Sequence, residues 1–303
     1  MLTRRDLLLG AACLAAPLRF APRSAVRLAV ITDLHHGLAP DAISRLGAFA
    51  KEVKNRRGLD AVLQMGDFCY SDEKATECTD LWRKIPGRKI HVLGNHDMDK
   101  VDKVQAMKFF GMASRYGSES INGFRFIHLD LNHFKKDGKL VSYANGNYFT
   151  DNATHNWADP EQLEWLKKEL KASTEPVIIL CHQPLGFAEP GQPMPPEQVE
   201  VMDILAAGPV AACLFGHLHV DRLEYCKEIP CLCVNSASYF WSNGMYAYSK
   251  PLFAFIEFGA DGVLRIEGAS GEFQHAPPAA SDGVLGRSAS ISSRRFAFRD
   301  RSK

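Results

Sequence analysis

Short apolar runs that end abruptly in Asp, Asn or His constrain the fold of this chain most strongly. Residues 26–32, 61–65 and 90–93 are three such runs, and the last leads directly into the Gly-Asn-His-Asp sequence at 94–97. Apolar runs of this length are typical of strands buried on both faces. Polar residues are costly at the end of a buried strand unless something there needs them. The pattern therefore predicts a functional site at the strand ends.

Helical patterns alternate with the apolar runs. Residues 40–55, 159–172 and 197–207 have helical features, and further apolar runs lie at 124–131, 176–181 and 211–215. Alternation of strand and helix predicts a parallel sheet covered by helices, whose strand ends place ligands. Residues 135–156 are rich in Gly, Asn and polar residues and are interpreted as a long loop over the site. Short runs at 221–225, 231–235, 252–258 and 262–267 predict an antiparallel meander in a second sheet.

Five strand ends carry side chains that can bind metal ions. They are Asp33-x-His35, Gly66-Asp67, Gly94-Asn95-His96-Asp97, His182 and Gly216-His217-x-His219. Mixed nitrogen and oxygen ligands suit Mn, Fe, Zn, Co or Ni, whereas calcium prefers oxygen alone. A lone His at a strand end is more often a structural residue. All five motifs in one chain, each after a buried strand, indicate a metal site.

The ordered set of motifs resembles the calcineurin-like metallophosphoesterase superfamily over roughly Val26 to Glu267. The resemblance implies a bacterial exported member with a four-layer α/β/β/α sandwich of two mixed sheets. It also implies a bimetallic site at the strand ends, and two divalent metal ions as cofactors. By position, the implied ligands are Asp33, His35 and His219 for the first metal, Asn95, His182 and His217 for the second, and Asp67 as the bridge.

The chemistry implied by the resemblance is hydrolysis of phosphoesters. A hydroxide bridging the metals would be the nucleophile, and His96 would be the general acid that protonates the leaving group. Asp97 would orient His96 or its loop, or would cap the following helix instead. Asn95, His36 and His133 are candidate substrate-binding residues, although packing roles explain the two histidines equally well. The aromatic run at 239–241 could line the pocket or the core.

Position 70 departs from two branches of the superfamily. Purple acid phosphatases have a Gly-Asp-x-x-Tyr motif whose Tyr binds iron, but they lack the His of Asp-x-His. Because His35 is present here, Tyr70 is interpreted as a wall residue. Ser/Thr phosphatases have an Asp at this position that partners the catalytic His. With Tyr70 in its place, Asp72 or Asp97 would have to partner His96, or His96 would act unaided.

The N-terminus is predicted to be an export signal. An arginine pair at positions 4 and 5 precedes an apolar run over residues 7–16, which is too short for a membrane span of about 20 residues. Residues 1–25 resemble a twin-arginine signal that directs the protein to the bacterial periplasm, with an ordinary secretion signal as the alternative. The catalytic domain is expected at 26–272, and residues 273–303, rich in Ala, Pro, Ser and Arg, are expected to be disordered.

The charge of the chain and its predicted export limit the expected partners and substrates. The net charge is +1, and the basic ends leave an acidic body, so nucleic acid is not an expected partner. A small phosphoester is the expected substrate. We favour phosphodiesters, as in class III cyclic-nucleotide phosphodiesterases. A broad exported phosphomonoesterase is the alternative, and a non-catalytic metal-binding or scaffold protein is the alternative of another class.

Overall fold

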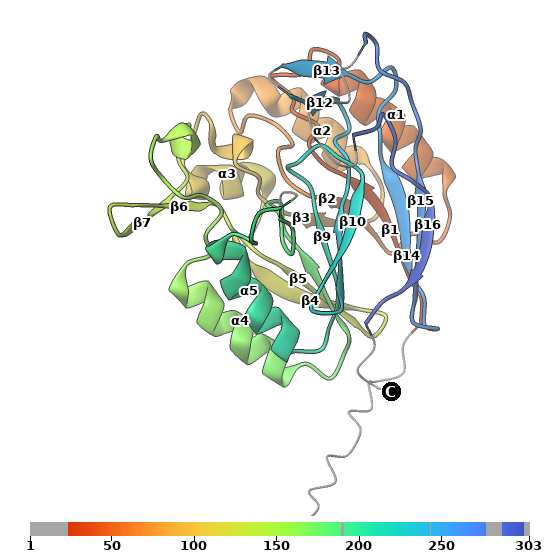
Figure 1. Ribbon diagram of the computed structural model, residues 1–303. Helices are drawn as coiled ribbons and strands as arrows, with labels where there is room; N and C mark the ends of the chain where they lie inside the picture. Colours follow the sequence, from red (N-terminus) through yellow and green to blue (C-terminus); the bar gives the residue numbers. More distant parts are fainter. Residues whose placement is uncertain (1–23, 189–190, 243, 277–286, 300–303) are drawn as a thin grey trace, which may run out of the picture.

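Two large mixed sheets lie face to face between two layers of helices in the computed structural model (Figure 1). The structure describes residues 24–188, 191–242, 244–276 and 287–299. The first sheet has the strand order β16-β15-β14-β1-β2-β3, and the second has the order β10-β11-β9-β8-β5-β4. The predicted α/β/β/α sandwich of two mixed sheets is confirmed.

The elements of the first sheet and its helices have the following bounds: β1 Val26–Ile31, α1 Ala42–Asn55, β2 Ala61–Gln64, α2 Thr76–Lys84, β3 Arg88–His91, α3 Lys103–Phe110, β14 Ala254–Phe258, β15 Val263–Gly268 and β16 Arg294–Ala297. Those of the second sheet and its helices are β4 Gly117–Ile121, β5 Phe124–His128, α4 Pro160–Ala172, β8 Val177–Leu180, α5 Pro196–Ala207, β9 Val210–Phe215, β10 Arg222–Cys226 and β11 Ile229–Cys233. Smaller elements are η1 Glu73–Ala75, η2 His96–Met98, β6 His133–Lys136, β7 Lys139–Ser142, η3 Asn147–Phe149, β12 Tyr239–Trp241 and β13 Met245–Ala247.

All residues of the strand β1 except the exposed Arg27 are apolar and buried. Leu28 and Val30 belong to the core between the two sheets, while Ala29 and Ile31 belong to the core beneath α1 and α2. Successive side chains of a strand point to opposite faces, so a strand covered on both faces needs apolar residues at every position. β1, β2 and β3 are parallel, as are β5, β8 and β9. Their carboxyl ends therefore lie at the same edge of each sheet.

The predicted second-sheet meander is only partly correct. β10 and β11 join the second sheet, but β14 and β15 join the first, where β14 pairs antiparallel with β1. All but one residue of β14 is buried. A strand this apolar gains most free energy at a position covered on both faces, rather than in an outer meander.

The expectation of a disordered tail is wrong for residues 287–299. β16 pairs with β15 at the edge of the first sheet, and Phe298 is buried beside Phe124 and Phe258. Asp221 accepts hydrogen bonds from Ser292 and Arg294. These anchors are separated by small polar residues, so the average composition hides them. Residues 277–286 and 300–303 lie outside the described residues.

Residues 135–156 are also more ordered than the predicted loop. β6 and β7 form a hairpin that projects from the body (Figure 1), and η3 follows it. The predicted signal at 1–25 lies almost entirely outside the described residues. Among the helices that the structure describes, none is long and apolar enough to cross a membrane.

A buried ion-pair network joins α3 and α4 to the end of β5. Asp130 is fully buried, and its Oδ2 lies 2.6 Å from Lys103 Nζ and 3.1 Å from Arg115 Nη1. Arg115 also pairs with Asp159, the N-cap of α4, at 2.5 Å. Burial opposes ionisation of Asp130, but Lys103 outweighs it, and the net effect holds the pKa of this carboxyl well below its usual range. The network therefore stabilises the fold only while Asp130 is ionised.

Replacing Asp130 with Asn should lower the free energy of unfolding by about 3–5 kcal/mol, because Lys103 would remain buried without a counter-charge. Urea denaturation at pH 7 measures the loss. The difference between the two proteins should be full above the unfolded-state pKa of about 3.9 and should shrink at lower pH. Asp80→Asn removes an exposed pair with Arg83 and should leave stability unchanged. Equal effects of the two substitutions would contradict the role of the network.

Candidate metal centre

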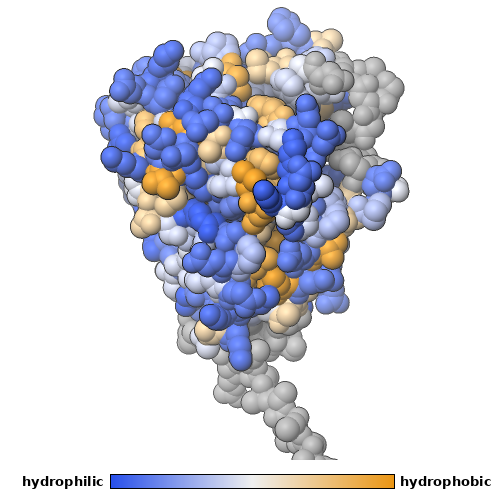
Figure 2. Space-filling model, turned by 90° about the vertical axis from the view of Figure 1, so that its left-hand side faces the viewer, coloured by the Kyte–Doolittle hydropathy of each residue, from blue (hydrophilic) through white to orange (hydrophobic). Residues whose placement is uncertain are grey.

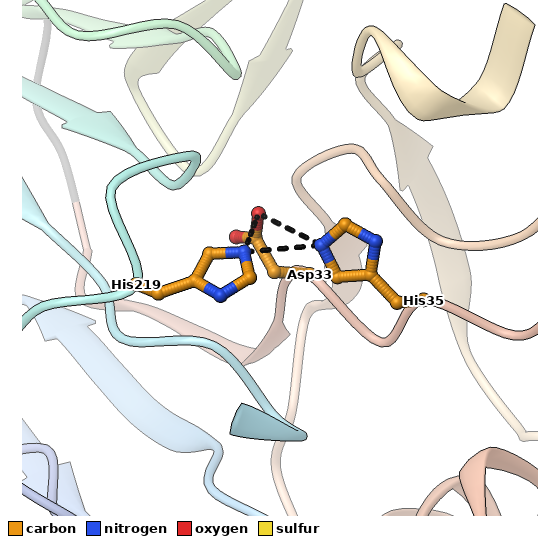
Figure 3. Close-up of side chains that lie close together, drawn as sticks. All are labelled: Asp33, His35 and His219. Atoms are coloured by element: carbon orange, nitrogen blue, oxygen red, sulfur yellow. Dashed lines mark hydrogen bonds and ion pairs between the residues drawn. The ribbon is translucent and has the colours of Figure 1, made fainter. Parts of the chain in front are cut away.

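The ends of β1 and β9 bring Asp33, His35 and His219 together (Figure 3). The three side chains point toward one another in the close-up. His219 Nε2 lies 3.1 Å from Asp33 Oδ1 and 3.0 Å from His35 Nε2. All three residues are almost fully buried. A carboxylate and two imidazoles whose ring nitrogens meet this closely form a set of ligands for one cation.

A second group of ligand atoms lies beside the first. His182 Nε2 is 3.1 Å from Asp67 Oδ2 and 3.3 Å from His217 Nδ1. Asp67 Oδ2 also lies 3.7 Å from His35 Nε2, so this carboxylate faces both groups. The carboxylate of Asp67 therefore faces both groups of ligand atoms, and its role as a bridge between metal ions stays a prediction.

Asn95 lies next to these groups and is 2% exposed. Neither its amide oxygen nor its amide nitrogen has a hydrogen-bond partner among the described residues. A buried amide without a partner costs free energy. An oxygen ligand that coordinates a cation would resolve this cost, so the donor set fits two metal ions.

Backbone strain concentrates at these strand ends. Positive φ is uncommon for residues other than glycine, because the Cβ atom is crowded there. The structure describes twelve such residues, and five of them are predicted ligands. These five are Asp33, His35, Asp67, His217 and His219. Strain of this kind persists where surrounding contacts enforce it, and it is frequent at active sites.

Hydrogen bonds to backbone carbonyls orient two of the histidines. His182 Nδ1 lies 2.9 Å from the Met65 carbonyl oxygen, and His219 Nδ1 lies 2.8 Å from the Tyr239 carbonyl oxygen. A carbonyl oxygen can only accept a hydrogen bond, so Nδ1 carries the proton in each of these two rings. Nε2 of the neutral ring therefore carries the lone pair that faces the cluster. This arrangement is the usual outer support of a metal-binding histidine.

Burial keeps two of the imidazoles neutral. It lowers the pKa of His35 to about 3 and that of His217 to about 3. Neutral imidazoles have the lone pair that metal binding requires.

The carboxylates attract positive charge to the site. Burial opposes ionisation of Asp33, but His219 and His182 outweigh it and lower its pKa to about 2. Burial lowers the pKa of His182, but Asp67 and Asp33 outweigh it and raise the value to about 9. Within the described ranges, Asp33 and Asp67 pair with no Lys or Arg. Two buried anions without a permanent counter-charge favour a bound cation.

His96 lines the cavity, but its partner differs from the predicted one. Its Nδ1 lies 2.7 Å from Asp99 Oδ2, and its side chain is 22% exposed. Burial lowers the pKa of His96, but Asp67 and Asp99 outweigh it and raise the value to about 9. Asp99 follows His96 by three residues in a helical turn, a spacing at which side chains meet. That spacing was the signal in the sequence that could have found Asp99.

Asp97 holds the loop instead of contacting His96. Its carboxylate accepts hydrogen bonds from the backbone N–H groups of Asp67, Phe68, Cys69 and Gly94. These four bonds fix the loop after β2 against the loop after β3. Of the predicted roles of Asp97, the geometry agrees with orienting the loop. Asp97 does not contact His96, and the following helix α3 is capped by Asp102 instead.

Two other predicted residues lie away from the cavity. The His36 ring is partly buried and does not line the cavity. His133 is buried in β6, with Nδ1 3.2 Å from the Trp157 carbonyl oxygen. The structure therefore does not bring His36 or His133 to the ligand cluster. Tyr70 does line the cavity, and its ring packs against Gly37, where a side chain would collide with it.

A cavity of about 730 Å³ opens onto the ligand cluster. Its lining includes His35, Asp67, Asn95, His96, Asp99, His217 and His219. The remaining lining residues are apolar or aromatic, namely Leu38, Tyr70, Tyr148, Phe149, Leu218, Tyr239, Trp241 and Met245. Tyr148 and Phe149 fall in a segment where the sequence indicated only a loop.

The family model of the calcineurin-like phosphoesterases matches residues 26–221. The chain belongs to this family. It is therefore a phosphoester hydrolase of a superfamily that works with two metal ions. No curated protein sequence matches this phosphoesterase.

Solved structures with the same fold include a dimetal phosphatase from Danio rerio. It is 14% identical, with a TM-score of 0.57, and the match covers 80% of this chain and 95% of that one. GAP50, the anchor in the inner membrane complex of Plasmodium, is 13% identical with a TM-score of 0.59, over 92% and 90%. Purple acid phosphatase PPD1 from yellow lupin is 15% identical with a TM-score of 0.54, over 91% and 54%. At these identities the likeness concerns the fold alone.

Gly94 is required by the close approach of the loops after β2 and β3. A Cβ atom at this position would collide with the carboxylate and the backbone nitrogen of Asp67. Gly94→Ala should therefore displace Asp67 and reduce the metal content after reconstitution with Mn below two ions per chain, as measured by mass spectrometry. Gly47→Ala is the control, since nothing lies within 4 Å of its Cβ position in α1. Full metal content in Gly94→Ala would refute this account.

Proposed function

We propose that this phosphoesterase hydrolyses phosphodiesters with a dinuclear centre of divalent metal ions. Asp33, His35 and His219 would hold the first ion. Asn95, His182 and His217 would hold the second, and Asp67 would bridge the two. The observation that carries the proposal is the pair of adjoining ligand groups, Asp33 with His35 and His219 and Asp67 with His182 and His217. The donor types suit Mn, Fe, Zn, Co or Ni.

When bound, two such ions activate water and neutralise the charge of the phosphoryl group. The protein's own contribution to the departure of the alcohol is His96. Asp99 occupies its Nδ1, which leaves Nε2 free to donate a proton to the leaving oxygen. The oxygen of the attacking water would form the new bond to phosphorus as the P–O bond to the alcohol breaks, and the alcohol would depart as a neutral molecule with the proton from His96. Asp99 is a positioning residue that fixes the imidazole and favours its protonated form.

The charge of the cavity supports a diester over a monoester. None of the described lining residues is Lys or Arg. A phosphodiester carries one negative charge, whereas a phosphomonoester carries up to two at neutral pH. A cavity with no Lys or Arg beside the proposed metal ions offers less to the second charge. An exported phosphomonoesterase remains the second candidate, and one set of assays separates the two.

Export is also part of the proposal. The arginine pair and the short apolar run at 1–25 support a twin-arginine route to the periplasm. Fractionation of cells that produce the protein with Arg4 and Arg5 replaced by Lys tests this route, and unchanged export would contradict it.

A panel of esters tests the reaction. The purified protein reconstituted with Mn, Fe, Zn, Co or Ni should hydrolyse bis(4-nitrophenyl) phosphate with a higher kcat/KM than 4-nitrophenyl phosphate. A reversed preference would favour the monoesterase. Absence of turnover with all five metals, together with two bound ions, would favour a metal-binding protein without catalysis.

The role of His96 is tested through the leaving group. His96→Ala should lower kcat for phenyl esters by roughly 10²–10⁴ but should affect 4-nitrophenyl esters far less, because nitrophenolate departs without a proton. Asp99→Asn should show the same leaving-group dependence with a loss of about 10–100-fold. Metal content should stay at the wild-type level in both. Asp72→Asn is the matched control, since Asp72 caps η1. A uniform loss for all esters would contradict the acid role.

A further inference from the structure

Two aromatic walls flank the ligand cluster. The first consists of Tyr148 and Phe149 in η3, whose rings lie 6.3 Å and 5.9 Å from the ring of His96. The second is built on the β12–β13 hairpin. Its Tyr239 ring lies 5.0 Å from that of His35 and 4.8 Å from that of His219. The walls thus stand beside different histidines of the site.

The outer part of each wall is exposed to solvent. Phe149 is 67% exposed, Trp241 is 57% exposed and Met245 is 47% exposed. Trp241 and Met245 are cross-strand partners on the hairpin, so they form one apolar surface. Only seven large apolar side chains are exposed among the described residues, and three of them line this single cavity. The face shown in Figure 2 is largely hydrophilic, with several apolar patches.

Exposed apolar surface beside a reactive site favours an apolar ligand, because covering it removes apolar area from water. The cavity of about 730 Å³ lies in the range that holds a whole small molecule rather than a phosphate group alone. The described lining residues include no Lys or Arg to pair with further phosphate groups. The ligand should therefore carry its single charge at the reacting phosphate and be apolar elsewhere.

The position of His96 indicates which alcohol of the diester lies beside each aromatic wall. The alcohol that it protonates must leave from the side of His96, which is the side of Phe149. The alcohol that stays on the phosphate then lies on the other side, beside Tyr239, Trp241 and Met245. We infer that the substrate is a phosphodiester whose retained alcohol is large and apolar and binds against Trp241 and Met245. The inference rests on the proposed function and adds the substrate class to it.

The test uses 4-nitrophenyl diesters that differ only in the retained alcohol: ethyl, hexyl or benzyl. In the wild-type enzyme with Mn, kcat/KM should be about tenfold or more higher for hexyl or benzyl than for ethyl, since each buried methylene adds to binding. The benzyl ester separates a planar apolar group from a flexible chain. A preference for either over ethyl supports the inference.

Three variants locate the preference. In Trp241→Ala the ratio of hexyl to ethyl should fall to about threefold or less. Phe149→Ala should lower kcat/KM for both esters and keep the ratio, because its wall faces the leaving group. Tyr225→Ala removes an equally exposed aromatic side chain outside the cavity and should keep both the rates and the ratio. A wild-type ratio near one, or an unchanged ratio in Trp241→Ala, would overturn the inference.

A binding measurement separates failure of the inference from failure of the proposed function. Hexylphosphonate and ethylphosphonate cannot be hydrolysed, and calorimetry should find tighter binding of the hexyl compound in the wild-type protein but not in Trp241→Ala. If no ester is hydrolysed with any metal, the proposed function fails while this result still stands. If esters are hydrolysed but both phosphonates bind equally, only the apolar subsite is refuted.

Discussion

Two buried carboxylates without a permanent counter-charge are the constraint on which the rest of this structure depends. Asp33 and Asp67 are almost fully buried, and among the residues that the structure describes their ion-pair partners are all histidines. Burial of an anion costs several kcal/mol unless a cation or hydrogen bonds compensate. Imidazoles compensate at neutral pH only by gaining a proton, whereas divalent metal ions compensate both carboxylates at once. The folded state and the bound metals are therefore thermodynamically linked, and metal binding stabilises the fold.

The scaffold holds this arrangement through contacts that take no part in the chemistry. Asp97 accepts hydrogen bonds from four backbone N–H groups in the loops after β2 and β3. Gly94 has no side chain and so leaves the space that Asp67 occupies. Positive φ at five of the proposed ligand residues adds strain that the two sheets must offset. The sandwich has a large apolar core to do so, since both faces of β1, β2 and β14 are covered. The unfavourable free energy of the site thus arises at the strand ends, and the apolar core between the sheets offsets it.

The clustering of the proposed ligand groups was predictable from the sequence because each motif is local. A buried strand that runs into Asp or His reports its own end, and parallel strands bring their ends to one edge. The position of β14 was not predictable in this way, because strand order depends on packing between distant segments. The order of residues 287–299 was not predictable from composition, because composition averages over single buried apolar residues such as Ile291 and Phe298 that anchor the segment. Asp99 was predictable from its spacing of three residues from His96, whereas Asp97 lies beside His96 in the sequence but does not contact it.

The sheets position the proposed metal ligands, and segments outside the sheets form the walls of the cavity. This difference explains why the family is easier to infer than the substrate. Every proposed ligand follows a strand of the two large sheets, so the fold places the metal chemistry. The aromatic walls come from η3 and the β12–β13 hairpin, which lie outside both sheets. Loop segments can vary in length and sequence without disturbing a core, and selectivity can differ among proteins that share this scaffold. If the proposed substrate class is correct, the choice of substrate in this enzyme depends on Phe149, Trp241 and Met245, whereas the reaction type depends on the strand ends.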